Sequence, residues 1–222
     1  RKNDNKDNFE LSDEELQKIV AEADTGGRKP TGLTANVLLV VALAWSLFQL
    51  WIASPLPFSL GVFVFNDTEA RAIHLAFAVF LAFAAYPALK RSPRDRVPIQ
   101  DWILAGAGAY CAAYLFLFYR ELSTRPGLPT DMDIATAVVG LTLLLEAARR
   151  ALGLPMVILA VVFLCYIFFG PYMPDVIAHR GASLAKGMSH MWLTTEGVFG
   201  VALGVSTSFI FLFVLFGALL ET

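Results

Sequence analysis

Glu146 is the acidic residue that lies deepest in apolar sequence, near the end of a long hydrophobic run. A carboxylate inside a membrane segment is a candidate for an ion or proton pathway, because an isolated charge is costly in hydrocarbon. Arg149 and Arg150 follow three and four residues later, which places both beside Glu146 on a helix surface. This spacing favours an interfacial ion pair of Glu146 with Arg149 and Arg150, while a coupling carboxylate stays open as the alternative.

The other residues that could do chemistry are scattered. No histidine, cysteine or acidic cluster has the spacing of metal ligands or of a catalytic triad. His74 is expected one turn inside an apolar segment, near Glu69 and Arg71, where a structural hydrogen bond is the favoured role. Cys111 and Cys165 lie in apolar runs, where a free thiol behaves as a small hydrophobe. We therefore expect no catalytic residue, no enzyme activity, no metal site and no cofactor.

Small residues recur at helical spacing in the last apolar run. Such residues allow a second helix to approach closely, so they predict a helix-packing face. Hydroxyl groups in residues 206–208 could line an ion or substrate path, although serine and threonine in spans usually bond their own preceding carbonyls. The predicted packing face consists of Gly197, Gly200, Gly204 and Ser208.

A short segment before that run, residues 182–195, has its own pattern. Its apolar residues fall on one helical face and its polar residues fall elsewhere. A helix of this kind is expected to lie in the membrane interface, with its tryptophan at the level of the headgroups. The apolar face of this predicted interfacial arm consists of Leu184, Met188, Met191 and Trp192.

The elements that carry these residues are expected to be membrane helices. The 222 residues are 57% hydrophobic and 16% charged, against roughly 45–50% and about 25% in an ordinary soluble domain. The net charge is -2, so the overall composition lacks the excess of basic residues that is typical of nucleic-acid-binding proteins. The composition therefore predicts an all-α, polytopic transmembrane helical bundle whose partner is the lipid bilayer.

Six apolar segments approach the roughly 20 residues that a helix needs to cross hydrocarbon. The fourth is the least apolar, because it carries Glu146 and the two arginines in its last turns, and it can span if these side chains reach the interface. The sequence thus predicts about six spans, at residues 33–53, 70–89, 102–119, 134–152, 154–173 and 198–220.

Basic residues predict the orientation, since lysine and arginine near span ends stay on the cytoplasmic side. With the N-terminus inside, twelve basic residues lie in cytoplasmic segments and five in external loops. The N-terminus is therefore expected in the cytoplasm.

Residues 1–32 form a polar tail. Ser12 and Glu15 have the spacing of a capping box, which predicts a short cytoplasmic helix. This helix could dock on the membrane domain or a partner, and a solvated tail is the open alternative. The first apolar run lacks the flanks of a cleaved signal peptide. Because the chain opens without methionine and stops right after an apolar run, we expect a fragment of a longer protein.

Three stretches together resemble a known transporter family. They are Glu22-Ala-Asp-Thr-Gly-Gly-Arg28, the segment from Gly153-Leu-Pro155 through Tyr166 and Gly170, and Thr195-Glu-Gly-Val-Phe-Gly200 through Phe211-Leu-Phe213 and Phe216-Gly217. The chain resembles the fused membrane subunit of TRAP (tripartite ATP-independent periplasmic) transporters, of the type that works with TAXI-type binding proteins.

The resemblance implies a division of the chain. Residues 33–152 look like the small four-helix subunit, and residues 153–222 like the start of the large transport subunit. It also implies a bacterial or archaeal cytoplasmic (inner) membrane, Na⁺ as coupling ion and a periplasmic binding protein that delivers organic acids such as dicarboxylates. Substrate and sodium ligands belong to later hairpins of the large subunit, so none is assigned here.

Two hypotheses follow. The first is a component of a sodium-coupled, binding-protein-dependent secondary importer in which this part is mainly scaffold. The second is a membrane scaffold or assembly module that transports nothing.

Overall fold

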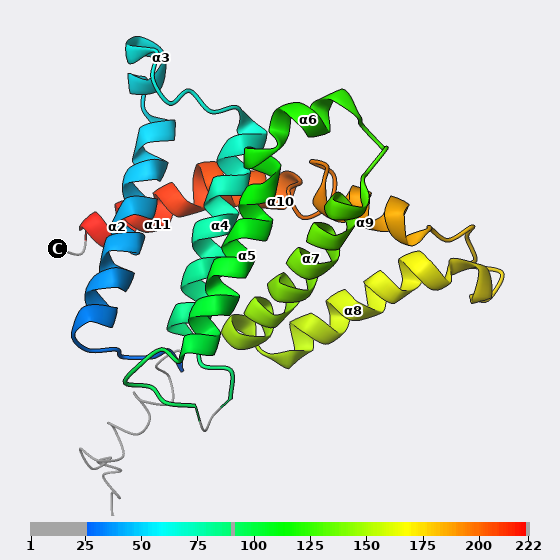
Figure 1. Ribbon diagram of the computed structural model, residues 1–222, viewed down its shortest axis with the longest axis horizontal. Helices are drawn as coiled ribbons and strands as arrows, with labels where there is room; N and C mark the ends of the chain where they lie inside the picture. The colour runs from blue at the N-terminus through cyan, green and yellow to red at the C-terminus, as the bar shows by residue number, and fades with distance from the viewer. Residues whose placement is uncertain (1–25, 90–91, 221–222) are drawn as a thin grey trace, which may run out of the picture.

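The computed structural model describes residues 26–89 and 92–220, and these residues form helices and connecting loops without a strand. The helix predicted in the N-terminal tail falls within residues 1–25, outside the described residues. Four long helices stand side by side in Figure 1. They are α2 (Leu33–Ala53), α4 (Asp67–Ala85), α5 (Ile99–Leu117) and α7 (Asp131–Leu152).

The remaining helices connect or flank this bundle. The short helices α3 (Leu56–Leu60) and α6 (Tyr119–Thr124) lie at its upper end in Figure 1, and α8 leans away from its lower end. Helix α8 spans Leu154–Phe169 and continues as a 3-10 turn, Gly170–Tyr172, before α9 (Leu184–Trp192). The last run comprises α10 (Val201–Val205), a π-helical turn (Ser206–Ile210) and α11 (Phe211–Leu220).

Side-chain caps explain where two of the bundle helices begin. At the start of α4, Asn66 Oδ1 accepts from Glu69 N at 2.8 Å and Glu69 Oε2 accepts from Asn66 N at 2.9 Å. At the start of α7, Thr130 and Asp133 form the same reciprocal pair. Because these capping boxes satisfy N–H groups that lack intrahelical partners, both helices begin three residues before the apolar runs predicted from the sequence.

The centre of the bundle is the contact between α4 and α5. Ala72 and Phe83 of α4 and Ala105 and Ala112 of α5 are fully buried. At Gly108 of α5, an added Cβ would lie only 2.6 Å from a methyl group of α4. Small residues on α5 therefore allow the two helix axes to approach closely.

A sharp turn joins the bundle to the remainder. Helix α7 ends and α8 begins at Gly153, whose φ of 89° is a conformation that favours glycine. The connection needs no loop, and α8 leaves α7 at an angle in Figure 1. The predicted division of the chain into two parts also falls at Gly153.

The structure supports a helical membrane protein, and the part of the chain that it describes has four helical segments long and apolar enough to cross a membrane. They are Leu33–Ala53, Asp67–Ala85, Leu154–Tyr172 and Val201–Leu220. Helices α5 and α7 have 19 and 22 residues, but α5 carries Asp101 in its first turn and α7 carries charged residues in its first and last turns. The prediction of six spans is thus supported for four, and membrane crossing by α5 and α7 remains a prediction.

The last predicted span differs most from its expected form. The helix begins at Val201 instead of residue 198 and includes a π-helical turn. In Figure 1 the α10–α11 run lies across α2 and α4, behind them, and does not stand beside them. Its side chains are largely exposed, with Phe213 at 71% and Leu220 at 72%.

Candidate functional site

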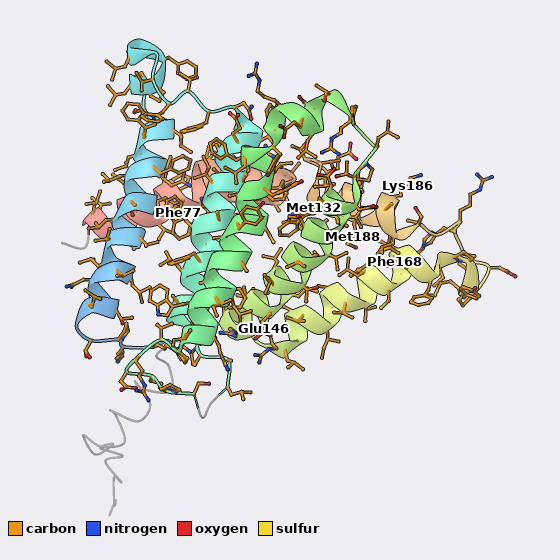
Figure 2. The ribbon with its side chains drawn as sticks, viewed as in Figure 1. Phe77, Met132, Glu146, Phe168, Lys186 and Met188 are labelled. Carbon is orange, nitrogen blue, oxygen red and sulfur yellow. The ribbon has the colours of Figure 1, made fainter. Side chains whose placement is uncertain are left out.

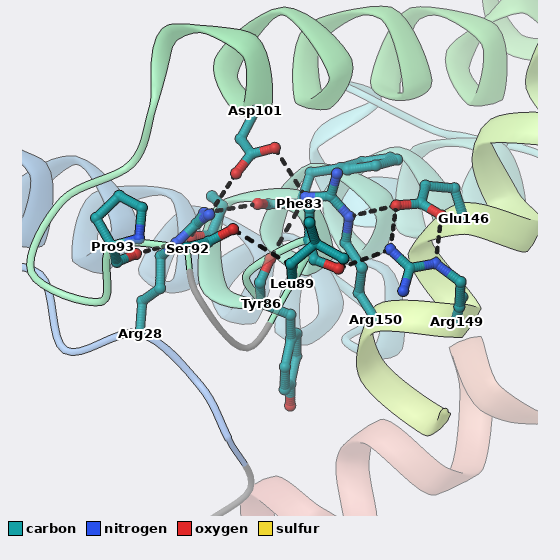
Figure 3. A network of polar contacts seen from close by, with 12 residues as sticks. Arg28, Phe83, Tyr86, Leu89, Ser92, Pro93, Asp101, Glu146, Arg149 and Arg150 are labelled. Carbon is teal, nitrogen blue, oxygen red and sulfur yellow. Dashed lines mark hydrogen bonds and ion pairs between the residues drawn. The ribbon is translucent and has the colours of Figure 1, made fainter. Parts of the chain in front are cut away.

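A network of charged side chains occupies the lower end of the bundle, and Figure 3 shows it from close by. Glu146 accepts hydrogen bonds from Arg149 Nε at 2.7 Å and from Arg150 Nε at 2.8 Å. Arg149 Nη2 donates to Glu146 as well, at 2.8 Å. The structure therefore brings the three predicted residues together at the end of α7. Both carboxylate oxygens have arginine partners, which favours the ion pair over a coupling role.

Asp101 extends this network from the first turn of α5. Its Oδ1 accepts from Arg150 Nη1 at 2.8 Å, and its Oδ2 forms an ion pair with Arg28. The side chains of Arg28, Arg150 and Asp101 are 0%, 3% and 6% exposed. We call these five residues, Arg28, Asp101, Glu146, Arg149 and Arg150, the ion network.

Sequence reasoning missed two members of the ion network. Asp101 carried a usable signal, because an acidic residue in the first turn of a helix interacts favourably with the helix dipole. Arg28 carried none, since it lies in a polar segment before the first apolar run and its partner is 73 residues away.

The arginines of the ion network also satisfy the C-terminal end of α4. Arg28 Nη1 donates to the carbonyls of Phe83 at 3.2 Å and Ala84 at 3.1 Å, and Arg28 N donates to Ala85 O at 2.7 Å. The guanidinium carbon of Arg150 lies 4.8 Å from the centre of the Phe83 ring. Because the last carbonyls of a helix lack intrahelical donors and carry partial negative charge, these cations stabilise the end of α4.

A second polar cluster lies at the upper end of the bundle, around the fully buried Asp133. Tyr114 Oη donates to Asp133 Oδ1 at 2.6 Å, Thr130 N donates to Oδ2 at 2.8 Å, and Arg125 forms an ion pair with the same carboxylate. Burial alone would raise the pKa of Asp133, but the hydrogen bonds from Tyr114, Thr130 and Arg125 outweigh it and lower the pKa. Asp133 was not singled out from the sequence, although Thr130 and Asp133 have capping-box spacing.

His74 belongs to a third cluster, between α2, α4 and the π-helical turn. Trp45 Nε1 donates to His74 Nδ1 at 3.2 Å, and Gln49 Nε2 contacts the same nitrogen. Ser206 Oγ lies 3.3 Å from His74 Nε2. The sequence predicted a structural hydrogen bond for His74, near Glu69 and Arg71. Its partners instead come from α2 and from the last apolar run.

The predicted small-residue face is not continuous in the structure. Gly197 and Gly200 precede α10 and form part of the turn after α9. A Cβ on Gly197 would lie 2.4 Å from the carbonyl oxygen of Met191, and one on Gly200 would lie 2.8 Å from the carbonyl oxygen of Gly197. These two glycines therefore permit a tight turn of the backbone and do not present a surface for another helix.

Gly204 does permit a close approach, although to a side chain. A Cβ there would lie 2.7 Å from the guanidinium carbon of Arg71. Arg71 Nη1 donates to the carbonyls of Phe199 at 2.9 Å and Gly200 at 3.0 Å. Ser208 Oγ donates to Gly204 O at 2.8 Å, the local bond that serine often makes in a span. Arg71 thus joins α4 to the beginning of the last apolar run.

The predicted interfacial arm forms a helix, α9, but its apolar face points into the protein. Met188 is 5% and Trp192 1% exposed, whereas Leu184 is 56% exposed and Met191 is half-buried. Trp192 Nε1 donates to Cys111 O of α5 at 3.0 Å. In Figure 2, Phe168 and Met188 lie where α7, α8 and α9 meet. Trp192 is therefore buried against α5 and α7, and its depth at the level of the headgroups stays a prediction.

Gly140 of α7 makes the Trp192 site possible. An added Cβ at Gly140 would lie 2.4 Å from the indole ring. On the other side, Phe199 meets Trp192 edge to face, with ring centres 5.4 Å apart. Trp192 therefore fills a slot between the bundle and the segment that follows α9.

These clusters are built for holding helices together. Their charged groups are paired with one another and with helix ends, and within residues 26–89 and 92–220 no group of three histidine, cysteine or acidic residues could hold a metal ion. No protein-family model, curated protein or solved structure matches the chain.

Proposed function

We propose that the chain is the membrane component of a secondary active importer of organic acids. In this proposal the importer is sodium-coupled, belongs to the TRAP type, and receives its substrate from a TAXI-type binding protein outside a bacterial or archaeal inner membrane. The described part acts mainly as a scaffold. A transport domain that moves in the membrane needs a part that does not deform, and a scaffold provides it.

The observation that supports the scaffold role is the contrast between the buried core of α4, α5 and α7 and the apolar helices around it. Ionic clusters hold both ends of this core, at Asp101 and at Asp133, and these two carboxylates are buried. By contrast, only 6% of the apolar window in each of Leu33–Ala53, Leu154–Tyr172 and Val201–Leu220 is buried, against 39% in Asp67–Ala85. A firmly held core with apolar helices around it is the arrangement expected of a scaffold that packs against further membrane elements.

Two contacts connect the bundle to the following part and support a combined function. Trp192 inserts against Gly140, and Arg71 binds the carbonyls of Phe199 and Gly200. Forces on the last apolar run would therefore reach α4 and α7 directly.

The proposal is tested by uptake into proteoliposomes that contain the full-length gene product, with a TAXI-type binding protein outside. We expect accumulation of a radiolabelled organic acid only when an inward sodium gradient is imposed. Replacing sodium by potassium, or omitting the binding protein, should abolish uptake. Accumulation that ignores both would refute the proposal.

The alternative, a scaffold that transports nothing, is favoured by one observation. Glu146 is the carboxylate that the sequence offered as a candidate for ion coupling. Both of its oxygens accept hydrogen bonds from arginines. The same proteoliposomes distinguish the two functions. A scaffold would give no uptake under any gradient while still co-purifying with its membrane partners from cells.

A further inference from the structure

An apolar groove of about 600 Å³ runs between α4 and α7. At one end it begins beside Trp45 and Ser206, and at the other it reaches Tyr86 and Leu152, where the ion network lies. Helix α4 is one of the four candidate spans, so the groove lies at membrane depth. The groove is open because small side chains form much of its walls: Ala78, Ala82 and Ala85 from α4, and Ala147, Ala148 and Ala151 from α7.

Two hydrogen-bond donors lie near this end of the groove, its mouth, because Tyr86 lines it and Arg149 follows the lining residue Ala148. Arg149 reaches the segment after α4, where its Nη2 donates to Ala88 O at 2.8 Å. Its Nη1 makes no hydrogen bond to the described residues, and Figure 3 shows this nitrogen outside the dashed contacts. The ring of Tyr86 points away from the ion network in the same view. A guanidinium nitrogen and a phenol are thus left for a ligand at this mouth.

Among the described residues, the charge at this end is positive. In the ion network, three guanidinium groups face two carboxylates, which leaves one positive charge uncompensated. Over the described residues of 26–32, 86–101 and 146–153 there are six basic and three acidic residues, a balance of +3. At the opposite end, residues 54–71 and 118–133 hold three basic and five acidic residues, a balance of -2.

We propose that this groove binds one anionic phospholipid, with an acyl chain between α4 and α7 and its phosphodiester on Arg149 and Tyr86. The groove supplies apolar surface for a chain, and the mouth supplies the complement of a single negative charge. Basic pockets between membrane helices are suited to such headgroups. The lipid would fill the space between α4 and α7 and stabilise their contact.

The test compares lipids on the purified protein in a neutral detergent, by native mass spectrometry and by thermal unfolding. The probes are dioleoyl phosphatidylglycerol, dioleoyl phosphatidylcholine and glycerol 3-phosphate. We expect phosphatidylglycerol to remain bound at one molecule per chain and to raise the unfolding temperature. Phosphatidylcholine should bind more weakly, and glycerol 3-phosphate, which has no acyl chain, should have no effect.

Two substitutions test the two parts of the site. Ala148→Phe fills the groove and should abolish the shift given by phosphatidylglycerol, whereas Val139→Phe, at an exposed position of the same helix, should retain it. Arg149→Gln should weaken binding about fivefold, because one basic residue near an anionic surface contributes on the order of 1 kcal/mol.

Arg149 also binds Glu146, so a second variant separates lipid binding from folding. The Tyr86 hydroxyl makes no hydrogen bond to the described residues, whereas its backbone carbonyl accepts from Arg150, so Tyr86→Phe removes the phenol and leaves the ion network in place. Tyr86→Phe should weaken phosphatidylglycerol binding without lowering the unfolding temperature in detergent alone. Equal binding of both lipids, an unchanged lipid shift in Ala148→Phe, or a full effect of glycerol 3-phosphate would each overturn the proposal.

Discussion

Asp101 forms ion pairs with two buried arginines, one from an earlier and one from a later part of the chain. Arg28 comes from the segment before α2 and Arg150 from the end of α7. The arginines in turn satisfy carbonyls at the end of α4. Removing the carboxylate would therefore leave the buried Arg28 without this counter-charge and Arg150 with Glu146 as its remaining carboxylate.

We expect Asp101→Asn to lower the free energy of unfolding by about 3–5 kcal/mol, the usual cost of breaking a buried ion pair on one side. Thermal unfolding in detergent measures it. Asp95→Asn is the matched control, because Asp95 is exposed in the loop before α5 and its loss should change the unfolding temperature little. Equal effects of the two substitutions would show that the ion network does not stabilise the bundle.

Asp133 predicts a pH dependence at the opposite end of the bundle. Its pKa is lowered in the folded protein, so its stabilising contribution is present above the unfolded value of about 4. That contribution is lost as the pH falls from about 4 through the folded pKa. Unfolding temperatures from pH 7 downward should therefore fall less steeply in Asp133→Asn than in the wild type, starting from a lower value at pH 7. Parallel curves would contradict the assignment.

At the scale of elements, α9 shows what determines whether the apolar stripe of a helix faces lipid or protein. The stripe could face lipid or protein, and Trp192 faces protein because Gly140 leaves room for its indole and Cys111 offers a carbonyl to its N–H. Docking of α9 thus depends on the absence of a side chain on α7.

Gly140→Ala should destabilise the protein by about 1–3 kcal/mol, the typical cost of overpacking a rigid core. Gly106→Ala in α5 is the control, since an added Cβ there meets nothing within 4 Å and alanine is the better helix former. Unfolding temperature and the fluorescence of the tryptophans report both changes. If the Gly140→Ala protein were as stable as the control, the indole of Trp192 would not pack against Gly140.

At the scale of the whole molecule, the two ends of the bundle differ in their number of basic residues, and this difference supports the proposed orientation. Over the described residues, the end with the ion network holds six basic residues and the opposite end three. Basic residues near span ends stay in the cytoplasm. The ion network should therefore lie at the cytoplasmic face.

Labelling of single cysteines in whole cells tests this orientation, with Cys111 and Cys165 replaced by alanine. Leu128→Cys, exposed in the loop before α7, should react with a membrane-impermeant maleimide. Asp95→Cys should react only after the cells are permeabilised. The reverse pattern would place the N-terminus outside.

The sequence by itself determined the helical character and the local contacts. Long apolar runs must satisfy their backbone groups internally, so they form helices in a membrane. Glu146, Arg149 and Arg150 meet because residues three and four apart share a helix face, whatever the rest of the chain does. The capping-box spacing of Thr130 and Asp133 is equally local, and it marks the start of α7.

Tertiary structure decided which residues meet across the chain. Arg28 and Asp101 are 73 residues apart, and His74 and Ser206 are 132 apart, so no local spacing relates them. Periodicity also could not tell whether the stripe of Trp192 faces lipid or protein, because both are apolar. The turn at Gly197 and the close approach of Arg71 to Gly204 likewise depend on which backbone lies opposite each glycine, and only the packed molecule determines that.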